Sequence, residues 1–323
     1  MKISSLNEKE IISAIRDSFV SSKKSLIQGI GDDAAVVRIG KRNFIYTKDL
    51  LIQDVHFKIS FHPPHLLARK SLNINLSDVA AMGGVPSYAL LGLGLPKKID
   101  SQWVEDFING LKSAAQEEGV NLIGGDISRS KKITLSVTVI GEGDSIITRS
   151  GGAPGDNLCV SGTLGDAKEG LLLLQRKHRM GEGREIDFIL KRFLDPFPQV
   201  SLGRELSRRN MPSSMVDLSD GISVDLGHIC EESGCGALIY KNKLPISWAL
   251  RSLQKKCFDF ALHGGEDYQL LFSIPKEKMG HLSELRKIYP ISTIGELISE
   301  KKIYVIDPQG RKKELKSKGY RHF

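Results

Sequence analysis

The chain is poor in cysteine and tryptophan, and its cysteines form no recognisable pattern. Its 323 residues include four cysteines and two tryptophans. The cysteines form no Cys-x-x-Cys pair and no zinc-ligand spacing, being Cys159, Cys230, Cys235 and Cys257. Neither a disulfide scaffold nor a structural zinc module is therefore indicated, and we expect four reduced thiols.

No segment is apolar enough to predict a membrane span or a secretory signal. The most apolar stretch, Tyr88–Leu95, is far shorter than the roughly 20 residues that cross a bilayer. The segment MKISSLNEKEIISAI carries charges where a signal peptide has its apolar centre. We therefore expect a cytoplasmic protein with no membrane partner.

The usual nucleotide-binding and nucleophile motifs are also missing. No GxxxxGK[ST] loop, no HRD and DFG pair and no GxSxG motif occurs. The GLGL run at 92–95 is followed by Pro96 and two lysines, so it does not open a helix as a Rossmann glycine motif does. A nucleotide site, if present, must be built in another way.

The net charge of +8 is concentrated at one end of the chain. Residues 301–323 hold eight Lys or Arg residues and two acidic ones, which accounts for +6 of that charge. No recognised nucleic-acid motif or aromatic-interleaved basic stripe accompanies them, so we expect no nucleic-acid partner. The segment is either a solvated basic terminus or a rim that attracts phosphates to an active site.

Helical and strand-like patterns alternate along the chain, which predicts an α/β (or α+β) fold. Beyond an amphipathic helix in the first 20 residues, we expect helices over 65–82, 102–118, 167–175 and 222–232. We expect strands over 35–39, 43–47, 87–95, 121–123, 133–140, 158–161, 215–218, 237–240, 268–274 and 303–306. The densest turn signal, RSGGAPGD at 149–156, predicts two domains, 1–148 and 149–323.

Carboxylates recur where apolar segments give way to glycines or turns. They are Asp32 and Asp33 in GIGDDAAVV, Asp49 after NFIYTK, Asp78 in NLSDVAAMGG, Asp126 after LIGG, Asp217 and Asp220 in MVDLSDG, and Glu266 and Asp267 in HGGEDY. Each alone could be a turn or helix cap. Together they could converge, because ligands of α/β sheets bind outside the carboxyl ends of strands.

Converging carboxylates repel one another and need cations at neutral pH. Oxygen ligands suit Mg²⁺, which typically combines a few carboxylates with substrate phosphates. The neighbouring glycines allow backbone N–H groups to approach phosphate oxygens. The pattern therefore predicts a Mg²⁺–nucleotide site without a Walker motif.

The histidines are less informative. His56 follows Asp49 by seven residues on an expected loop, where it could contact a substrate or be structural. His62 and His65 flank two prolines, which favours a rigid turn over a metal pair, and His263 precedes GGEDY and could orient that loop.

In eight ordered motifs the chain resembles the thiamine-monophosphate kinase family. The motifs are GIGDDAAVV, TKDLLIQDVHF, NLSDVAAMGG, GGD at 124–126, TRSGGAPGD, VDLSDG, GGEDY and GYRHF. Several are shared with the wider group of aminoimidazole-ribotide synthetase-like enzymes, whereas the combination of DVHF, LSDG–GGEDY and GYRHF resembles the thiamine-phosphate member.

The resemblance implies an N-terminal ATP- and Mg²⁺-binding domain whose sheet pairs with that of a second subunit into a β-barrel. It implies a homodimer with a C-terminal α/β domain, and the reaction of ATP with thiamine monophosphate to give ADP and thiamine diphosphate. No acid, base or nucleophile is implied, because transfer is direct and assisted by several Mg²⁺ ions.

Site residues are carried over motif by motif. The resemblance implies Mg²⁺ ligands at Asp32, Thr47, Asp49, Asp78, Asp126, Asp217 and Asp220. It implies ATP contacts at Gly125, Asp126, Arg149 and Ser219, and contacts to thiamine monophosphate at His56, Glu266, Asp267 and Tyr320.

Two positions depart from the family pattern. The family often has Trp where this chain has Tyr320, and a small polar residue where it has Lys48. Selenophosphate synthetase, aminoimidazole-ribotide synthetase and a non-catalytic nucleotide-binding protein are the alternatives. The first is disfavoured because the N-terminal segment has no Cys, and a hydrogenase-maturation relative because the chain ends in Phe323 rather than in Cys.

Overall fold

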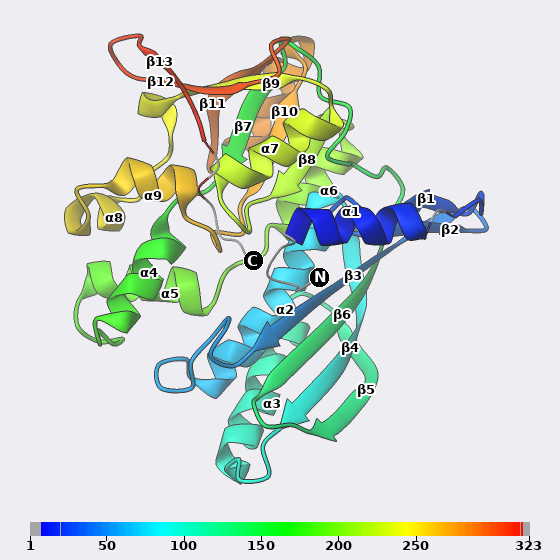
Figure 1. Ribbon diagram of the computed structural model, residues 1–323, viewed down its shortest axis with the longest axis vertical. Helices are drawn as coiled ribbons and strands as arrows, with labels where there is room; N and C mark the ends of the chain where they lie inside the picture. The colour runs from blue at the N-terminus through cyan, green and yellow to red at the C-terminus, as the bar shows by residue number, and fades with distance from the viewer. Residues whose placement is uncertain (1–7, 20, 317, 319–323) are drawn as a thin grey trace.

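Two β-sheets joined by a central helix form the protein (Figure 1). The computed structural model describes residues 8–19, 21–316 and 318. The first sheet has the strand order β1-β2-β3-β6-β4-β5, and only β4 and β5 run parallel. Its strands are β1 (Leu26–Gln28), β2 (Ala35–Ile39), β3 (Arg42–Ile52), β4 (Val85–Leu95), β5 (Asn121–Arg129) and β6 (Thr134–Gly143).

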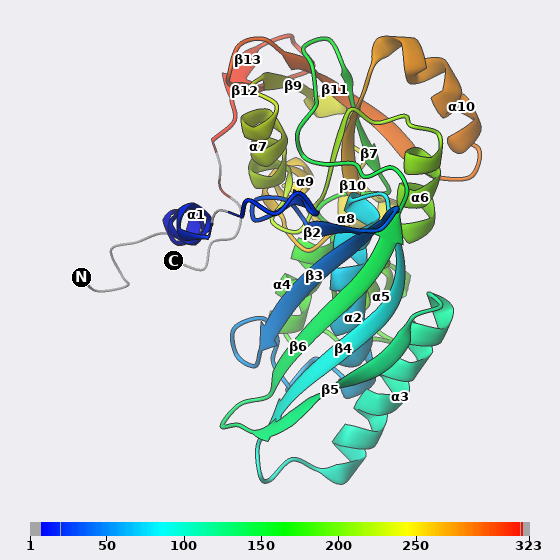
Figure 2. The same ribbon diagram turned by 90° about the vertical axis from the view of Figure 1, so that its right-hand side faces the viewer.

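Helices cover one face of this first sheet. α2 (Pro64–Ala81) and α3 (Ser101–Glu117) lie on that face, and Figure 2 shows the opposite face without a covering helix. In β6, buried and half-buried residues alternate, as expected for a strand with one face in the core. The other face carries partly exposed apolar side chains, such as Leu50 and Tyr88.

The second sheet has the order β13-β12-β9-β11-β7-β10-β8, and β9 and β12 run parallel. Its strands are β7 (Asn157–Ser161), β8 (Ser214–Asp217), β9 (Gly236–Tyr240), β10 (Leu270–Ile274), β11 (Ile291–Ile298), β12 (Ile303–Ile306) and β13 (Lys312–Glu314). The helices of this half are α4 (Asp166–Gln175), α5 (Arg184–Leu194), α6 (Val200–Arg208), α7 (Ile222–Glu232), α8 (Trp248–Leu253), α9 (Cys257–His263) and α10 (Leu282–Leu285), with 3-10 turns η2 (Lys241–Lys243) and η3 (Lys276–His281).

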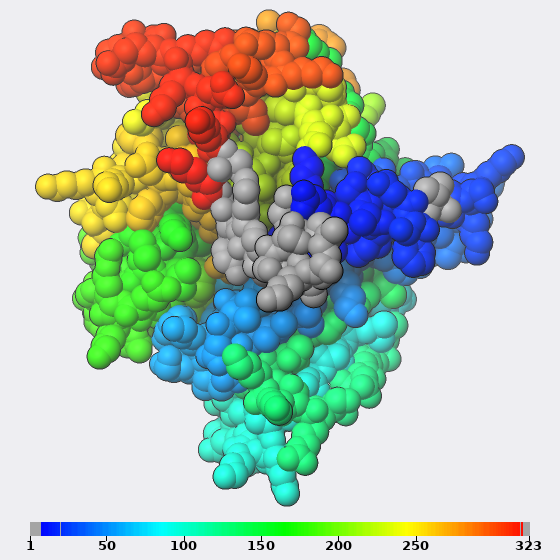
Figure 3. Space-filling view, in the orientation of Figure 1, coloured from blue at the N-terminus to red at the C-terminus, as the bar shows by residue number. Residues whose placement is uncertain are grey.

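Helix α1 (Glu8–Ser18) lies on the surface against α7. Figure 3 shows the blue N-terminal surface beside the yellow-green surface of the segment that contains α7, and the Lys9 ammonium contacts the Glu231 carboxylate at 2.5 Å. The helix buries no residue, although its apolar positions repeat at helical spacing. It therefore attaches to the fold mainly by charge.

Helix α2 is buried on nearly all sides and joins the two halves. Thirteen of its 18 residues are buried, and it contacts β3 and β6 of the first sheet as well as α6 and β8 of the second half. At Gly203 of α6, a Cβ would lie 2.2 Å from the Ala80 carbonyl oxygen, so only glycine permits this approach. Since one core spans both halves, the division into domains 1–148 and 149–323 stays a prediction.

The expected mixed α/β class with two sheets is confirmed, but several boundaries are wrong. β5 does not stop at residue 123; it continues through Gly124 and Gly125 to Arg129. A Cβ at Gly125 would lie 1.9 Å from the Leu91 carbonyl oxygen of β4, so these glycines permit close strand pairing where we expected a turn. β3 continues to Ile52, and α5, α6 and β11 were not predicted.

Two expectations from composition can be compared with the fold. No helix within the described residues is long and apolar enough to cross a membrane. All four cysteines are buried and free.

Candidate active site

Five aspartates from four segments gather where the two sheets meet. Asp32 and Asp33 precede β2, Asp49 lies on β3, Asp78 in the last turn of α2, and Asp217 ends β8. The negative charges of Asp33 and Asp49 both raise the pKa of Asp78 and of Asp217. The sequence-predicted convergence therefore occurs for these residues, which we call the aspartate cluster.

Asp78 is held by a neighbouring strand. The Thr47 hydroxyl donates a short hydrogen bond to its Oδ2. Burial raises the pKa of Asp78 well above its usual range, and the charges of Asp49 and Asp217 add to this effect. Burial also raises the pKa of Asp49 to about 6, and the Asp49 backbone N–H donates to Asn75 Oδ1 at 3.0 Å. Both carboxyls are therefore costly to ionise without a cation.

Asp217 completes the cluster from the second sheet. It is 2% exposed, and the Ser77 hydroxyl donates to its Oδ2 at 2.7 Å. Burial raises its pKa to about 8, and the charge of Asp33 adds to this shift. Helix α2 thus places carboxylates of both halves: it carries Asp78 itself, and its Ser77 orients Asp217 of β8.

One guanidinium faces the cluster. Arg149 Nη2 donates to Asp33 Oδ1 at 2.5 Å, and the Arg149 backbone N–H donates to Asp32 Oδ2 at 3.2 Å. Burial and the charge of Asp33 raise the pKa of Asp32 to about 7, although Arg149 opposes the shift. Arg149 brings one positive charge to the five carboxyls of the cluster, which is too little to balance them if all are ionised.

The donor set fits a hard divalent cation. Asp33 Oδ2 is buried without a hydrogen-bond partner in the described part of the chain, and carboxylate oxygens are the ligands that Mg²⁺ prefers. Among the described residues, no three His, Cys, Asp or Glu side chains are grouped tightly enough to enclose a metal ion. A cation at these carboxylates would therefore need further oxygen ligands, such as water or phosphate.

The loop after β8 carries Ser219 and Asp220. The Asp225 carboxylate accepts the N–H groups of Asp220, at 3.1 Å, and of Gly221, at 2.8 Å. Burial raises the pKa of Asp225 well above its usual range, and the charge of Asp220 adds to this. The Ser219 carbonyl accepts the Glu266 N–H at 2.7 Å. Asp220 thus lies beside Asp225, and Ser219 lies against the GGEDY loop.

Asp126 does not join the cluster within this chain. It is exposed on β5 and pairs in register with Gly92 of β4, which pairs with Ser136 and thus with Leu50 of β3. Because side chains alternate along a strand, Asp126 points to the open face and Asp49 to the opposite one. Gly125 lies beside it on the same edge strand. Asp126 borders a shallow hollow of about 300 Å³ that is lined mainly by glycine and serine.

The expected substrate residues occupy different environments. His56 is half-buried, and its Nδ1 accepts the Ile52 N–H at 3.0 Å. The Glu266 side chain is 32% exposed, and its Oε1 contacts the buried Lys70 ammonium at 2.7 Å. Asp267 instead accepts the N–H groups of Gly165 and Ala167, at 2.6 and 3.1 Å, at the start of α4. Asp267 thus caps a helix, and Tyr320 lies outside the described residues.

Sequence reasoning missed some residues of the site. Only Asp32 was expected to be a ligand, yet its neighbour Asp33 also lies in the aspartate cluster. The signal that could have identified Asp33 is the pair of adjacent aspartates itself. Asn75 and Ser77 gave little signal: both are buried in α2, but polar residues in a helical pattern look like surface positions. Lys70 gave none, because a lysine in a helical pattern normally points to solvent.

Comparisons with known proteins place the chain among similar sequences. Residues 31–142 match the family described as AIR synthase related protein, N-terminal domain. The chain is 36% identical to thiamine-monophosphate kinase of Buchnera aphidicola subsp. Schizaphis graminum, over 98% of this chain and 99% of that protein. It is 34% identical to the Aquifex aeolicus thiamine-monophosphate kinase, over 100% of both chains.

A solved structure is similar over the whole length. AaThiL complexed with AMPPCP and TMP is 32% identical and superposes with a TM-score of 0.88, covering 100% of this chain and 99% of that one.

Proposed function

This chain belongs to the thiamine-monophosphate kinase family, and on that premise we propose that it phosphorylates thiamine monophosphate. ATP is the donor, and thiamine diphosphate and ADP are the products. The observation that carries this proposal is the aspartate cluster, with five acidic groups facing one guanidinium. The similar AaThiL binds AMPPCP and TMP, which supports the same pair of ligands here.

The aspartate cluster would hold Mg²⁺ ions, with Thr47 beside it. Asp220, in the loop after β8, would be a further Mg²⁺ ligand. Bound Mg²⁺ would neutralise phosphate charge and align the two phosphates. The chain's own contribution is orientation: Thr47 and Ser77 fix the carboxylates of Asp78 and Asp217 by hydrogen bonds.

No side chain needs to remove a proton from the acceptor. The acceptor is already a phosphate anion, so the barrier lies in bringing two polyanions together in line. Arg149 supplies positive charge beside the cluster, and together with Ser219 it would contact ATP. We therefore expect direct transfer, and a labelled phosphoprotein trapped in a single-turnover quench would contradict it.

His56 and Glu266 would contact thiamine monophosphate, with Tyr320 stacking on a ring of the substrate. His56 lies in the loop after β3, and Glu266 is held by Lys70 of α2 and by Ser219 of the loop after β8. Asp267 is a weaker candidate, because its carboxylate already binds two backbone N–H groups of α4.

Gly125 and Asp126 would act on ATP and Mg²⁺ from a second copy of the chain. Their strand lies at the edge of the first sheet, and Asp126 faces away from the cluster. The open face, with Leu50 47% and Tyr88 46% exposed, suits pairing with a second sheet into a closed barrel, which would form a homodimer.

Two inactive variants test this arrangement. We expect Asp126→Asn to lower turnover by about 10²–10⁴-fold, as for loss of a charged transition-state contact. If Asp126 serves the partner's cluster, mixing Asp126→Asn with Asp217→Asn restores one intact site per mixed dimer, or about a quarter of wild-type activity after random exchange. No recovery, with exchange shown by mixed-dimer capture, would refute a contribution from the second copy.

The first assay mixes purified protein with Mg-ATP and thiamine monophosphate. Equal amounts of ADP and thiamine diphosphate, abolished by EDTA, are expected. ATP binding without diphosphate formation would refute the proposed reaction.

A further inference from the structure

Lys70 is a lysine in the interior of the protein. It lies in α2 and is 1% exposed, and it is among the largest fully buried side chains. Burying an ammonium costs free energy unless acceptors and an opposite charge compensate it. Its partners therefore indicate why this position carries a lysine.

The ammonium of Lys70 joins two segments of the C-terminal half. Its Nζ donates to the Phe193 carbonyl at 3.1 Å and lies 3.8 Å from the centroid of the Phe193 ring. It lies 2.7 Å from Glu266 Oε1. Phe193 lies in the last turn of α5, whose terminal carbonyls lack helical partners, so the first contact is structural. The contact with Glu266 is not needed for that role.

Glu266 is suited to connect a buried group with a ligand. Its φ of +68° is in the left-handed region, which a non-glycine residue occupies only when its surroundings fix it. Its backbone is held by Ser219, and its side chain is 32% exposed. Lys70 contacts Oε1 at 2.7 Å from the interior, and the exposed third of the Glu266 side chain is where a ligand could reach the carboxylate.

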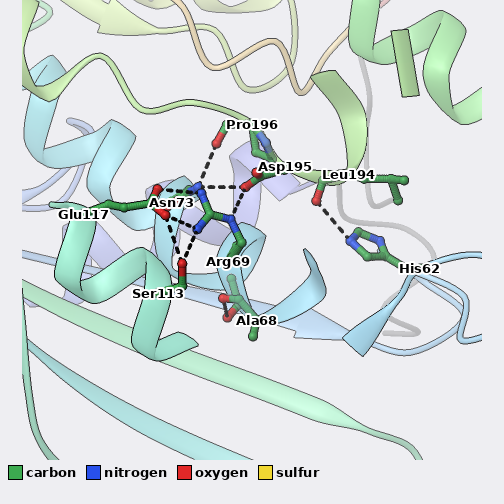
Figure 4. Close-up of polar contacts among 10 residues, drawn as sticks. His62, Ala68, Arg69, Asn73, Ser113, Glu117, Leu194, Asp195 and Pro196 are labelled. Atoms are coloured by element: carbon green, nitrogen blue, oxygen red, sulfur yellow. Dashed lines mark hydrogen bonds and ion pairs between the residues drawn. The ribbon is translucent and has the colours of Figure 1, made fainter. Parts of the chain in front are cut away.

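Residues next to Lys70 on α2 also hold the end of α5, which separates the structural role of Lys70 from its contact with Glu266. Arg69 binds Asp195 and Glu117, and Asn73 binds the Pro196 carbonyl (Figure 4). These contacts fasten the end of α5 to α2 and α3 without touching Glu266. Burial lowers the pKa of His62 to about 3, and the charge of Lys70 adds to this. Lys70, which lies next to Arg69, extends this set of contacts to the GGEDY loop.

We propose that Lys70 is a positioning residue for thiamine monophosphate, which it serves by holding the Glu266 carboxylate in one orientation at the junction of the two sheets. Glu266 then accepts N–H groups of the aminopyrimidine ring of the substrate. This inference rests on the proposed function and extends it to a residue that does not itself touch the substrate. An oriented carboxylate binds better because less rotational freedom is lost on binding.

The test compares Lys70→Met, Glu266→Gln and the double variant with a matched control, Arg69→Met. Affinity for thiamine monophosphate is measured by calorimetry and as KM, with KM for ATP and the melting temperature alongside. We expect Lys70→Met and Glu266→Gln each to weaken thiamine monophosphate binding about tenfold, the effect of one charged hydrogen bond. ATP affinity stays unchanged, and the double variant is no weaker than the weaker single variant.

Arg69→Met should lower the melting temperature and leave both affinities unchanged. If folded Lys70→Met binds thiamine monophosphate as wild type does, or if the effects of Lys70→Met and Glu266→Gln add fully, the inference is wrong. Should Lys70→Met fail to fold, Glu266→Asp keeps the charge but shortens the reach to Lys70. Glu266→Asp should then bind thiamine monophosphate as weakly as Glu266→Gln does, and wild-type affinity in this variant would overturn the proposal. A wild-type protein that makes no thiamine diphosphate would instead refute the proposed function.

Discussion

Replacing Asp217 by asparagine should stabilise the metal-free protein while abolishing its activity. The carboxyl is 2% exposed and lies near the charges of Asp33 and Asp49. Asparagine has nearly the same shape, and its amide oxygen can accept the Ser77 hydroxyl that now donates to Asp217. The substitution thus removes a repelling charge and leaves the hydrogen bond in place.

The magnitude follows from the pKa of Asp217, which burial raises from 3.8 to about 8. Each pKa unit corresponds to about 1.4 kcal/mol, so ionising Asp217 in the folded state costs at most about 6 kcal/mol. The neighbouring carboxyls share this repulsion, and we expect Asp217→Asn to gain about 2–4 kcal/mol at pH 8.

The sign of the pH dependence is fixed by the direction of that shift. Because the folded pKa lies above the unfolded one, the folded wild type keeps a proton that the unfolded chain has released. Wild-type stability therefore falls as the pH rises from about 4 to about 8. The asparagine variant has no such proton, so its advantage is small near pH 4 and largest near pH 8.

Urea unfolding in EDTA at about pH 5 and pH 8 measures this difference. A matched control is Asp307→Asn, because hydrogen bonds from Arg311 lower the pKa of that half-buried carboxyl, so its removal should bring no gain. If Asp217→Asn were no more stable than wild type at pH 8, or gained equally at both pH values, the repulsion argued for the aspartate cluster would be wrong. Saturating Mg-ATP should reverse the order by stabilising the wild type only.

Other substitutions test the packing of the fold. Gly203→Ala should destabilise by about 1–3 kcal/mol in thermal unfolding, because its Cβ would lie 2.2 Å from the Ala80 carbonyl oxygen. Gly227→Ala in α7, where a Cβ meets nothing within 4 Å, should instead stabilise by about 0.5–1 kcal/mol, and a loss there would contradict the argument. Asp267→Ala should cost about 1–3 kcal/mol through loss of two N–H acceptors at α4, with thiamine monophosphate affinity of the folded protein unchanged; a selective rise in KM would make Asp267 a substrate residue.

The sequence predicted the elements whose periodicity is local. The helix of α2 was expected over 65–82 and is observed over Pro64–Ala81. Its burial on both sides was not predictable from periodicity, because Asn75 and Ser77 look like surface residues until Asp49 and Asp217 are brought next to them. Long-range neighbours decide which polar residues are buried, and a single sequence does not contain them.

The same limit applies to Lys70 and Asp267. A lysine flanked by arginine and serine predicts a solvated helix face, and only the ends of α5 and of the GGEDY loop, more than 120 residues away along the chain, make it an interior residue. Asp267 looked equivalent to Glu266 in the GGEDY motif. The left-handed backbone at Glu266 turns these adjacent carboxylates to different neighbours, the Lys70 ammonium and a helix N-terminus.

The position of Asp126 depends on strand register, which motif reading does not determine. Asp49 pairs with Val137, which leads through Leu91 to Gly125, whereas Asp126 pairs with Gly92. Shifting β5 by one residue would turn Asp126 to the face of Asp49, since alternation gives neighbouring residues opposite faces. The irregularity in the β4–β5 pairing at Ala89 and Leu90 helps to set the observed register. A carboxylate turned to the open face can serve a cluster of this kind only in another subunit, so the mixing experiment with Asp126→Asn tests the register and the dimer together.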